Sequence, residues 1–226
     1  MTTRSASVSP VVAVAGAGVF GALASMLTIV LGPAIQPSFP ILFYLKFDLA
    51  EVVDIIAFFV FGPVAGVLTA TVHLVILSFA PGGTGPFGAS LKFLAVLTTY
   101  AGLVLASRVG RQSLRRAGLS MTTSSLVTRV LLMTVVNYVY IIVLAKALFN
   151  TDYAFFAQLV LGQAGINLTG SELVAYILGL TAVYNAIHAI FSVVVSLVVV
   201  SALLNRAPQL LDSRAWVTNH LLRTSE

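Results

Sequence analysis

Apolar stretches about as long as a membrane is thick recur along this chain, and they constrain its fold more than any other feature. The first covers residues 11–31, and the last covers residues 172–204. About 20 apolar residues in a helix cross the hydrocarbon core of a bilayer. Charged residues make up only 8% of the chain, whereas soluble domains carry about 25%. The sequence therefore predicts an all-α integral membrane protein.

The apolar stretches are separated by proline, glycine and charged residues, which divide the chain into elements. We expect one membrane domain over residues 1–226, built as a bundle of six transmembrane helices. A basic cytoplasmic loop is expected at 108–125 and a polar tail at 205–226. The predicted helices cover residues 11–31, 41–61, 64–80, 87–107, 126–149 and 172–204.

Arginine placement predicts the orientation of the bundle. With the N-terminus inside, all nine arginines fall at or near the cytoplasmic side, and the three lysines fall toward the outer half. The opposite orientation would place four loop arginines outside, against the positive-inside rule. We therefore expect both termini in the cytoplasm. This placement is typical of membrane topology rather than of a nucleic-acid-binding surface.

Three acidic residues, Asp48, Glu51 and Asp54, recur at helical spacing near the start of the second predicted helix. Charges in hydrocarbon are costly, about 3 kcal/mol each at the bilayer centre, so we interpret this stripe as the interfacial outer end of the helix. Acids there also complement the helix dipole. No histidine lies nearby in sequence, so we expect no metal site.

Small residues line one face of the first helix, where Ala13, Ala17 and Gly21 recur every four positions. Such spacing lets another helix approach closely. The partner helix can belong to this chain or to another protein, and the spacing alone leaves both interpretations open.

Several polar side chains lie inside the apolar stretches. Intramembrane polar groups are expensive and are functional candidates by default, although hydrogen bonds between helices also explain them. Asparagines and ionisable groups on three helices, with tyrosines as flat surfaces, suit a small-molecule pocket. The candidate substrate-binding residues are Lys92, Asn137, Tyr138, Tyr184, Asn185 and His188, with His73 and Tyr140 as further polar positions.

Sequence motifs for catalysis are missing. The chain has no cysteine and no GxxxxGK[ST], HExxH or GxSxG pattern, so it does not hydrolyse ATP by a P-loop. The glycine-rich loop at 81–86 follows an apolar stretch and has no phosphate-binding context.

Several runs of residues, in order, resemble the S components of energy-coupling factor vitamin transporters, and the riboflavin-specific family most closely. They are LKFDLAE at 45–51, FGPVAGVL at 61–68, GPFG at 85–88, FLA at 93–95, VNY at 136–138 and YNAIH at 184–188.

This resemblance implies a cell-membrane subunit that captures a vitamin, riboflavin or a related flavin, as transported cargo in an outward-facing pocket. It implies no cofactor and no enzymatic activity, because a membrane coupling protein and two ATPase subunits would supply the energy. The pocket positions carried over are Asn137, Asn185 and His188, with Lys92 close by. The face formed by Ala13, Ala17 and Gly21 would meet the coupling protein.

The chain departs from the riboflavin pattern at several pocket positions. His188 stands where that family usually has lysine, His73 and Leu74 replace Lys-Asn, and Ala89 and Lys92 replace Glu and Asn. Three alternatives stay open. The cargo can be another vitamin or precursor. The chain can be a membrane enzyme using His73 or His188, which needs a paired acid. It can also be an assembly subunit without a ligand.

Overall fold

The computed structural model describes residues 8–144, 147, 158, 160–207 and 215–221. Over these residues the secondary structure is helical, apart from one isolated bridge between Ser38 and Lys46. The elements are α1 (Pro10–Met26), the π-helical turn η1 (Leu27–Leu31), α2 (Gly32–Ile35), α3 (Ala50–Phe61), α4 (Pro63–Phe79), α5 (Gly85–Ser107), α6 (Leu114–Tyr138), η2 (Val139–Leu144), α9 (Gly170–Arg206) and α11 (Trp216–His220).

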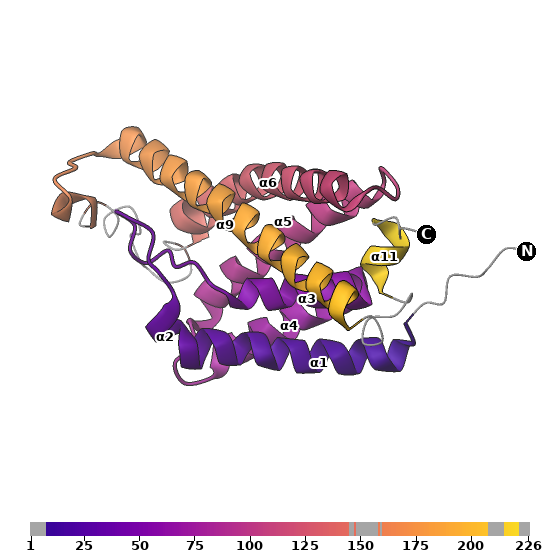
Figure 1. Cartoon of the computed structure of the whole chain (residues 1–226). Helices are drawn as coiled ribbons and strands as arrows, with labels where there is room; N and C mark the ends of the chain where they lie inside the picture. Colours follow the sequence, from indigo (N-terminus) through magenta and orange to yellow (C-terminus); the bar gives the residue numbers. More distant parts are fainter. Residues whose placement is uncertain (1–7, 145–146, 148–157, 159, 208–214, 222–226) are drawn as a thin grey trace, which may run out of the picture.

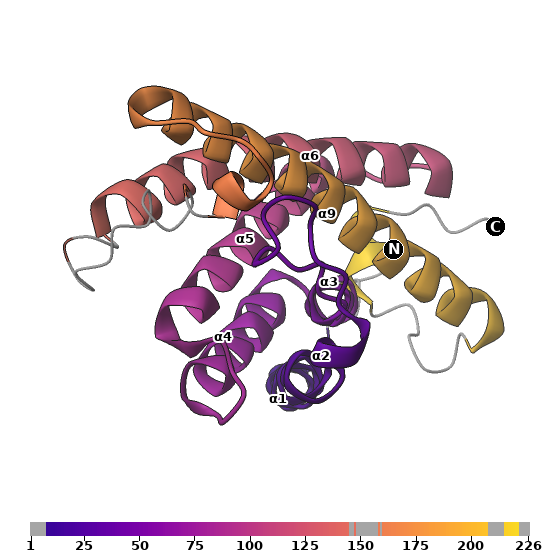
Figure 2. The ribbon, with the colours of Figure 1, turned by 90° about the vertical axis from the view of Figure 1, so that its left-hand side faces the viewer.

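Helix α3 is the centre of the bundle. Its residues from Ala50 to Val60 are all buried, and it contacts α1, α4, α5 and α9, which surround it (Figure 2). The outer helices instead expose large apolar side chains such as Val14, Val135 and Val198. That exposure suits a lipid environment, because lipid tails are as apolar as these side chains.

Within the described part of the chain, four helical stretches are long and apolar enough to cross a bilayer. They are Pro10–Ile35, Gly85–Ser107, Leu114–Tyr138 and Gly170–Arg206. Helix α4 is apolar but has 17 residues, and α3 has only 12. The count of six spans and the cytoplasmic placement of both termini stay predictions.

Helix α3 begins at Ala50, whereas the sequence suggested a helix from residue 41. Residues 36–49 instead fold back on themselves, with the amide of Phe39 donating to Leu45 O at 2.7 Å and that of Phe47 to Pro37 O at 3.0 Å. Ile41 has a positive φ of 72°, a left-handed conformation that a right-handed helix does not contain. Phe39 and Leu42 of this segment pack in an apolar cluster with residues of α9.

Helix α6 begins at Leu114, so the expected loop over 108–125 shrinks to 108–113. The predicted end of this helix, at 149, lies outside the described residues. In the sequence, the first turns of α6 resemble a loop because their exposed side is polar. A regular row of buried residues nevertheless continues through them. Every fourth residue of α6 is buried: Ala117, Met121, Ser125, Arg129, Met133 and Asn137.

The other predicted helices differ from the structure by a few residues. The first continues through Gly32 and Pro33 to Ile35, and those predicted at 64–80, 87–107 and 172–204 correspond to α4, α5 and α9.

The C-terminal helix α11 packs against the end of α3. The Trp216 ring lies 4.9 Å from that of Phe58, and the Arg111 guanidinium donates to Thr218 O at 3.1 and 2.8 Å. Figure 1 shows α11 at the same end of the molecule as the start of α1, whereas α2 lies at the opposite end. Part of the predicted polar tail is therefore integrated into the fold.

Candidate functional site

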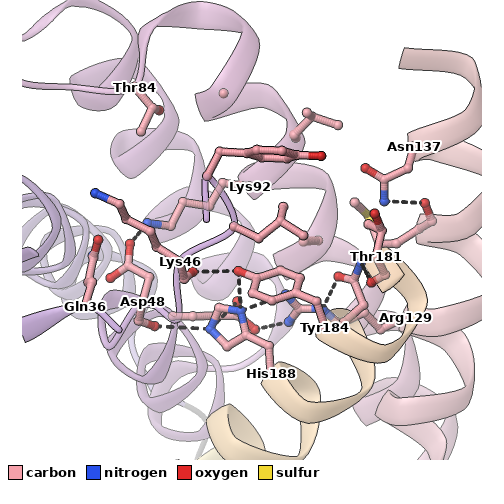
Figure 3. A pocket seen from close by; sticks show the side chains of 18 of the residues that line it. Gln36, Lys46, Asp48, Thr84, Lys92, Arg129, Asn137, Thr181, Tyr184 and His188 are labelled. Carbon is pink, nitrogen blue, oxygen red and sulfur yellow. Dashed lines mark hydrogen bonds and ion pairs between the residues drawn. The ribbon is translucent and has the colours of Figure 1, made fainter. Parts of the chain in front are cut away.

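A cavity of about 400 Å³ opens beside the start of α3, at the end away from α11. Residues of α3, α5, α6 and α9 form its walls, and residues of the 36–49 segment line it as well (Figure 3). This volume lies in the range of small-molecule sites. The cavity is mostly apolar but contains an unusual number of charged side chains.

The first ion pair joins Asp48, just before α3, to Lys92 on α5. The Thr28 hydroxyl donates to Asp48 Oδ2 at 2.8 Å and accepts from Lys92 Nζ at 3.0 Å. The other carboxylate oxygen accepts from the amide of Ala50 at 2.8 Å. Asp48 therefore accepts from the first amide of the central helix and fixes the lysine at the cavity wall.

The second ion pair joins Glu51 on α3 to Arg129 on α6. Both side chains are about 1% exposed. Arg129 also donates from Nε to Asn185 Oδ1 at 3.0 Å and from Nη1 to Thr99 Oγ1 at 3.2 Å. A buried charge needs such pairing to offset its desolvation cost. The guanidinium thus connects α3, α5, α6 and α9 at the cavity floor.

His188 and Tyr184 of α9 tie the 36–49 segment to the same network. The Tyr184 hydroxyl donates to Lys46 O at 2.6 Å and lies 3.1 Å from His188 Nδ1. The ring of Phe47 packs on both, with centroids 5.1 Å from Tyr184 and 5.7 Å from His188. In Figure 3 the Tyr184 and His188 side chains lie together beside Arg129.

The structure brings most of the predicted site residues together. Lys92, Asn137, Tyr184, Asn185 and His188 line the one cavity. Tyr138 does not line it and is 47% exposed, because it follows Asn137 on the helix and so points from a different face. A role in substrate binding stays a prediction for each of these residues.

Sequence reasoning missed the charged residues of the cavity, Asp48, Glu51 and Arg129. It assigned the acids to an interfacial end and the arginine to the cytoplasmic side. The acids are instead buried, with exposures of 5% for Asp48, 1% for Glu51 and 0% for Asp54. Each one pairs with a base on a different helix, and those bases lie far away in sequence. The sequence signal that could have found Arg129 is its place in the row of α6 residues, spaced four apart, that are buried.

Comparison with known proteins places the chain in a family. Residues 13–200, which are most of the chain, match the family model described as the ECF transporter, substrate-specific component. The protein belongs to this family. Among solved structures, it is similar to that described as "Structure and mechanism of the S component of a bacterial ECF transporter". The match has 21% sequence identity and a TM-score of 0.60, and covers 85% of this chain and 95% of the other.

A search of curated proteins found no match. The structural similarity, at this identity, supports the S-component fold alone, whereas the family match identifies the class of activity. The protein is the substrate-capturing subunit of an ECF importer and is not an enzyme. S components work with membrane and ATPase subunits of the ECF module. With its apolar helices, this S component is a multi-pass membrane protein.

A third buried pair lies beside the cavity of this S component. His73 Nδ1 on α4 is 2.9 Å from Asp54 Oδ2 on α3, and His73 Nε2 lies 3.2 Å from Thr28 Oγ1. Asp54, assigned from the sequence to an interfacial helix end, is therefore paired with a histidine inside the bundle. Because S components are not enzymes, the pair has a binding or structural role. Among the described residues, no group of three or more potential ligands is placed for a metal ion.

The small-residue face of α1 packs largely within the S component itself. Ala17 and Gly21 are buried, and a Cβ added at Gly21 would lie 2.6 Å from Val72 Cβ on α4. Ala13 is partly exposed, while Gly18 and Ala22 on the adjacent stripe are exposed. Packing within the chain thus accounts for Ala17 and Gly21, and a contact of this face with the coupling protein stays a prediction.

Proposed function

We propose that this S component captures riboflavin or a closely related flavin in the cavity beside α3, as part of a vitamin importer in the cell membrane. A membrane coupling protein and two ATPase subunits would drive release, and the chain itself would hold cargo rather than a cofactor. The observation that carries the proposal is the convergence of polar side chains from four helices and the 36–49 segment on one vitamin-sized cavity.

The lining suits a flat, polar-edged ligand. Tyr44, Phe87 and Tyr184 offer aromatic surfaces, and Leu91 and Met133 add apolar area. Aromatic side chains bind flat rings through offset or edge contacts. Amide and charged groups elsewhere in the cavity provide donors and acceptors for the polar edge of a flavin ring and for its sugar-like chain.

Several of the residues that carry the resemblance to riboflavin-specific S components line this cavity. The run at 45–51 contributes Lys46, Asp48 and Glu51, and the run at 184–188 contributes Tyr184 and His188. This agreement between sequence resemblance and position supports the flavin assignment.

The replacement of lysine by His188 has a physical counterpart nearby. Arg129 Nη2 lies 3.4 Å from His188 Nδ1, so a guanidinium, itself paired with Glu51, stands next to the position where the family usually has an ammonium. Arginine keeps its charge at all relevant pH values. The departure at 188 is therefore compatible with the same class of ligand. A different vitamin or precursor remains the second candidate, favoured by the changed charges at positions 92 and 188.

A titration of the purified protein with riboflavin, followed by quenching of flavin fluorescence, tests this assignment. Tyr184→Phe should weaken binding by up to about tenfold, because the hydrogen bond that it removes, worth about 1 kcal/mol, holds the cavity-lining segment 36–49 against α9 at Lys46 O. Tyr138→Phe is the matched control, since its side chain does not line the cavity.

Absence of riboflavin binding by the unmodified protein would contradict the flavin assignment. Binding of another vitamin in its place, with the same response to Tyr184→Phe, would support the second candidate. Equal loss in both tyrosine variants would show that the ligand does not sit in this cavity.

A further inference from the structure

We propose that Glu51 and Asp48 make this cavity select uncharged ligands, because they occupy the two cations that would otherwise bind an anionic group. The inference rests on the proposed capture of a substrate in this cavity, and it adds the charge class of that substrate. It also assigns a specificity-determining role to two residues that the sequence had placed at a membrane interface.

Arg129 has little capacity left for an anion. Its Nη1 pairs with Glu51 and donates to Thr99, and its Nε donates to Asn185. The remaining nitrogen, Nη2, lies 3.4 Å from His188 Nδ1. Arginine binds carboxylate and phosphate groups best through two parallel hydrogen bonds. An anionic ligand could form that arrangement only by displacing Glu51 from Nη1 or Asn185 from Nε, and Glu51 is itself buried at 1% exposure. Displacement would leave a buried carboxylate without its partner, which is strongly unfavourable.

Lys92 is occupied in the same way. Its Nζ pairs with Asp48 and donates to Thr28 Oγ1 at 3.0 Å. Asp48 is fixed in turn, because it accepts from the amide of Ala50 at the start of α3. The carboxylate therefore cannot move away from the lysine without losing its hydrogen bond to the first amide of the central helix.

The remaining lining charges do not change this balance. His188 lies between the two charges of one pair, with Nε2 3.5 Å from Glu51 Oε2 and Nδ1 3.4 Å from Arg129 Nη2. Lys46 is exposed, so water screens its charge. The described ionisable residues that line the cavity are Lys46, Asp48, Glu51, Lys92, Arg129 and His188, with the phenols Tyr44 and Tyr184.

Two carboxylates thus cancel two cations in the deep part of the cavity. A ligand with a net charge would add an unbalanced charge in a poorly solvated site, which is unfavourable. A neutral polar ligand meets no such penalty, because its hydroxyl, amide or imide groups can hydrogen-bond to the outer edges of the ion pairs.

Matched neutral and anionic flavins test the proposal. Riboflavin is neutral, riboflavin 5′-phosphate carries its anion at the sugar end, and 8-carboxyriboflavin carries it at the ring end. Whichever end enters first, one of the two analogues places its charge deep in the cavity. The unmodified protein should bind that analogue at least about tenfold more weakly than riboflavin.

Glu51→Gln should raise the affinity for that anionic analogue, relative to the affinity for riboflavin, by about tenfold or more. The substitution keeps the size of the side chain and frees Arg129 for an anion. Asp48→Asn should act similarly through Lys92 and retains an oxygen that can accept from the amide of Ala50. Glu172→Gln is the matched control, since Glu172 is exposed in the first turn of α9 and does not line the cavity.

Two results would overturn the proposal. The first is that both anionic analogues bind the unmodified protein as tightly as riboflavin. The second is that Glu51→Gln and Asp48→Asn both keep the affinity ratio between riboflavin and the anionic analogue that the unmodified protein has. If Glu51→Gln fails to fold, Asp48→Asn decides, because its partner Lys92 is 17% exposed and the pair is less deeply buried.

A second ligand pair separates this proposal from the flavin assignment. If riboflavin does not bind, neutral pantothenol and anionic pantothenate are compared in the same way. Tighter binding of pantothenol would support charge selection while the flavin assignment fails. If neither riboflavin nor pantothenol binds, the proposed capture of substrate in this cavity is contradicted, and the proposed charge selection is contradicted with it.

Discussion

Arg129 is the residue on which the cavity floor depends. It is 1% exposed and contacts side chains of α3, α5 and α9. A buried ion pair adds little net stability compared with an apolar pair, but removing one partner leaves the other charge uncompensated. This asymmetry makes the arginine and its partner Glu51 directly testable.

Replacing Arg129 by methionine should lower the stability of the protein by about 3–5 kcal/mol, because Glu51 then lacks its partner. Thermal unfolding in detergent measures the effect. Arg115→Met, an exposed arginine on the same helix, should change stability by no more than about 0.5 kcal/mol.

Adding Glu51→Gln to Arg129→Met should restore part of the lost stability, because it removes the uncompensated carboxylate. The double variant is measured beside both single variants in a double-mutant cycle. Strictly additive losses would contradict the pairing of Glu51 with Arg129.

Sequence reasoning recognised polar residues of the cavity where they interrupt an apolar helix, as Asn185 and His188 do. It failed for residues whose partners are distant in sequence. Asp48, Glu51 and Asp54 look like an exposed stripe until Lys92, Arg129 and His73 are placed against them in space. Tyr138 was predicted as an aromatic residue inside an apolar stretch, next to Asn137, and the structure shows that it does not line the cavity.

At the scale of elements, the close approach of α1 to α4 depends on a glycine. A Cβ at Gly21 would lie 2.6 Å from Val72 Cβ and 2.9 Å from Thr69 O. A Cβ at Gly18, one turn earlier on the same helix, meets nothing within 4 Å. The two glycines therefore form a matched pair of sites.

Gly21→Ala should destabilise the protein by about 1–3 kcal/mol, because the helices must separate to admit the methyl group. Gly18→Ala should stabilise it by up to about 1 kcal/mol, because alanine favours the helix. Unfolding midpoints in detergent compare the two variants. Stabilisation by both substitutions would show that α1 does not pack on α4 through Gly21.

Long apolar stretches were sufficient to locate most of the helices from sequence. They could not reveal that α3 is short and fully enclosed, since a buried helix and a lipid-facing helix are both apolar. They also could not reveal the polar first turns of α6, where the buried stripe of Ala117, Met121 and Ser125 carries the helix beyond the apolar region.

At the scale of the whole molecule, the orientation in the membrane follows from the arginines. The segment near Arg108 and Arg111 is predicted inside, and the segment near Pro81 is predicted outside. The chain has no cysteine, so single cysteines can report each side without background.

In intact cells, Pro81→Cys should react with a membrane-impermeant maleimide, while Val109→Cys should react only after the membrane is opened. Both positions are exposed, so access to reagent depends on the side of the membrane. The reverse labelling pattern would contradict the predicted orientation.

The absorption spectrum of the protein, purified in detergent without added ligand, tests most directly whether the cavity holds a flavin. We expect a yellow preparation with the visible absorption of a bound flavin, weakened in Asn185→Ala because Asn185 lines the cavity. A colourless preparation that also fails to bind added riboflavin would contradict the flavin assignment.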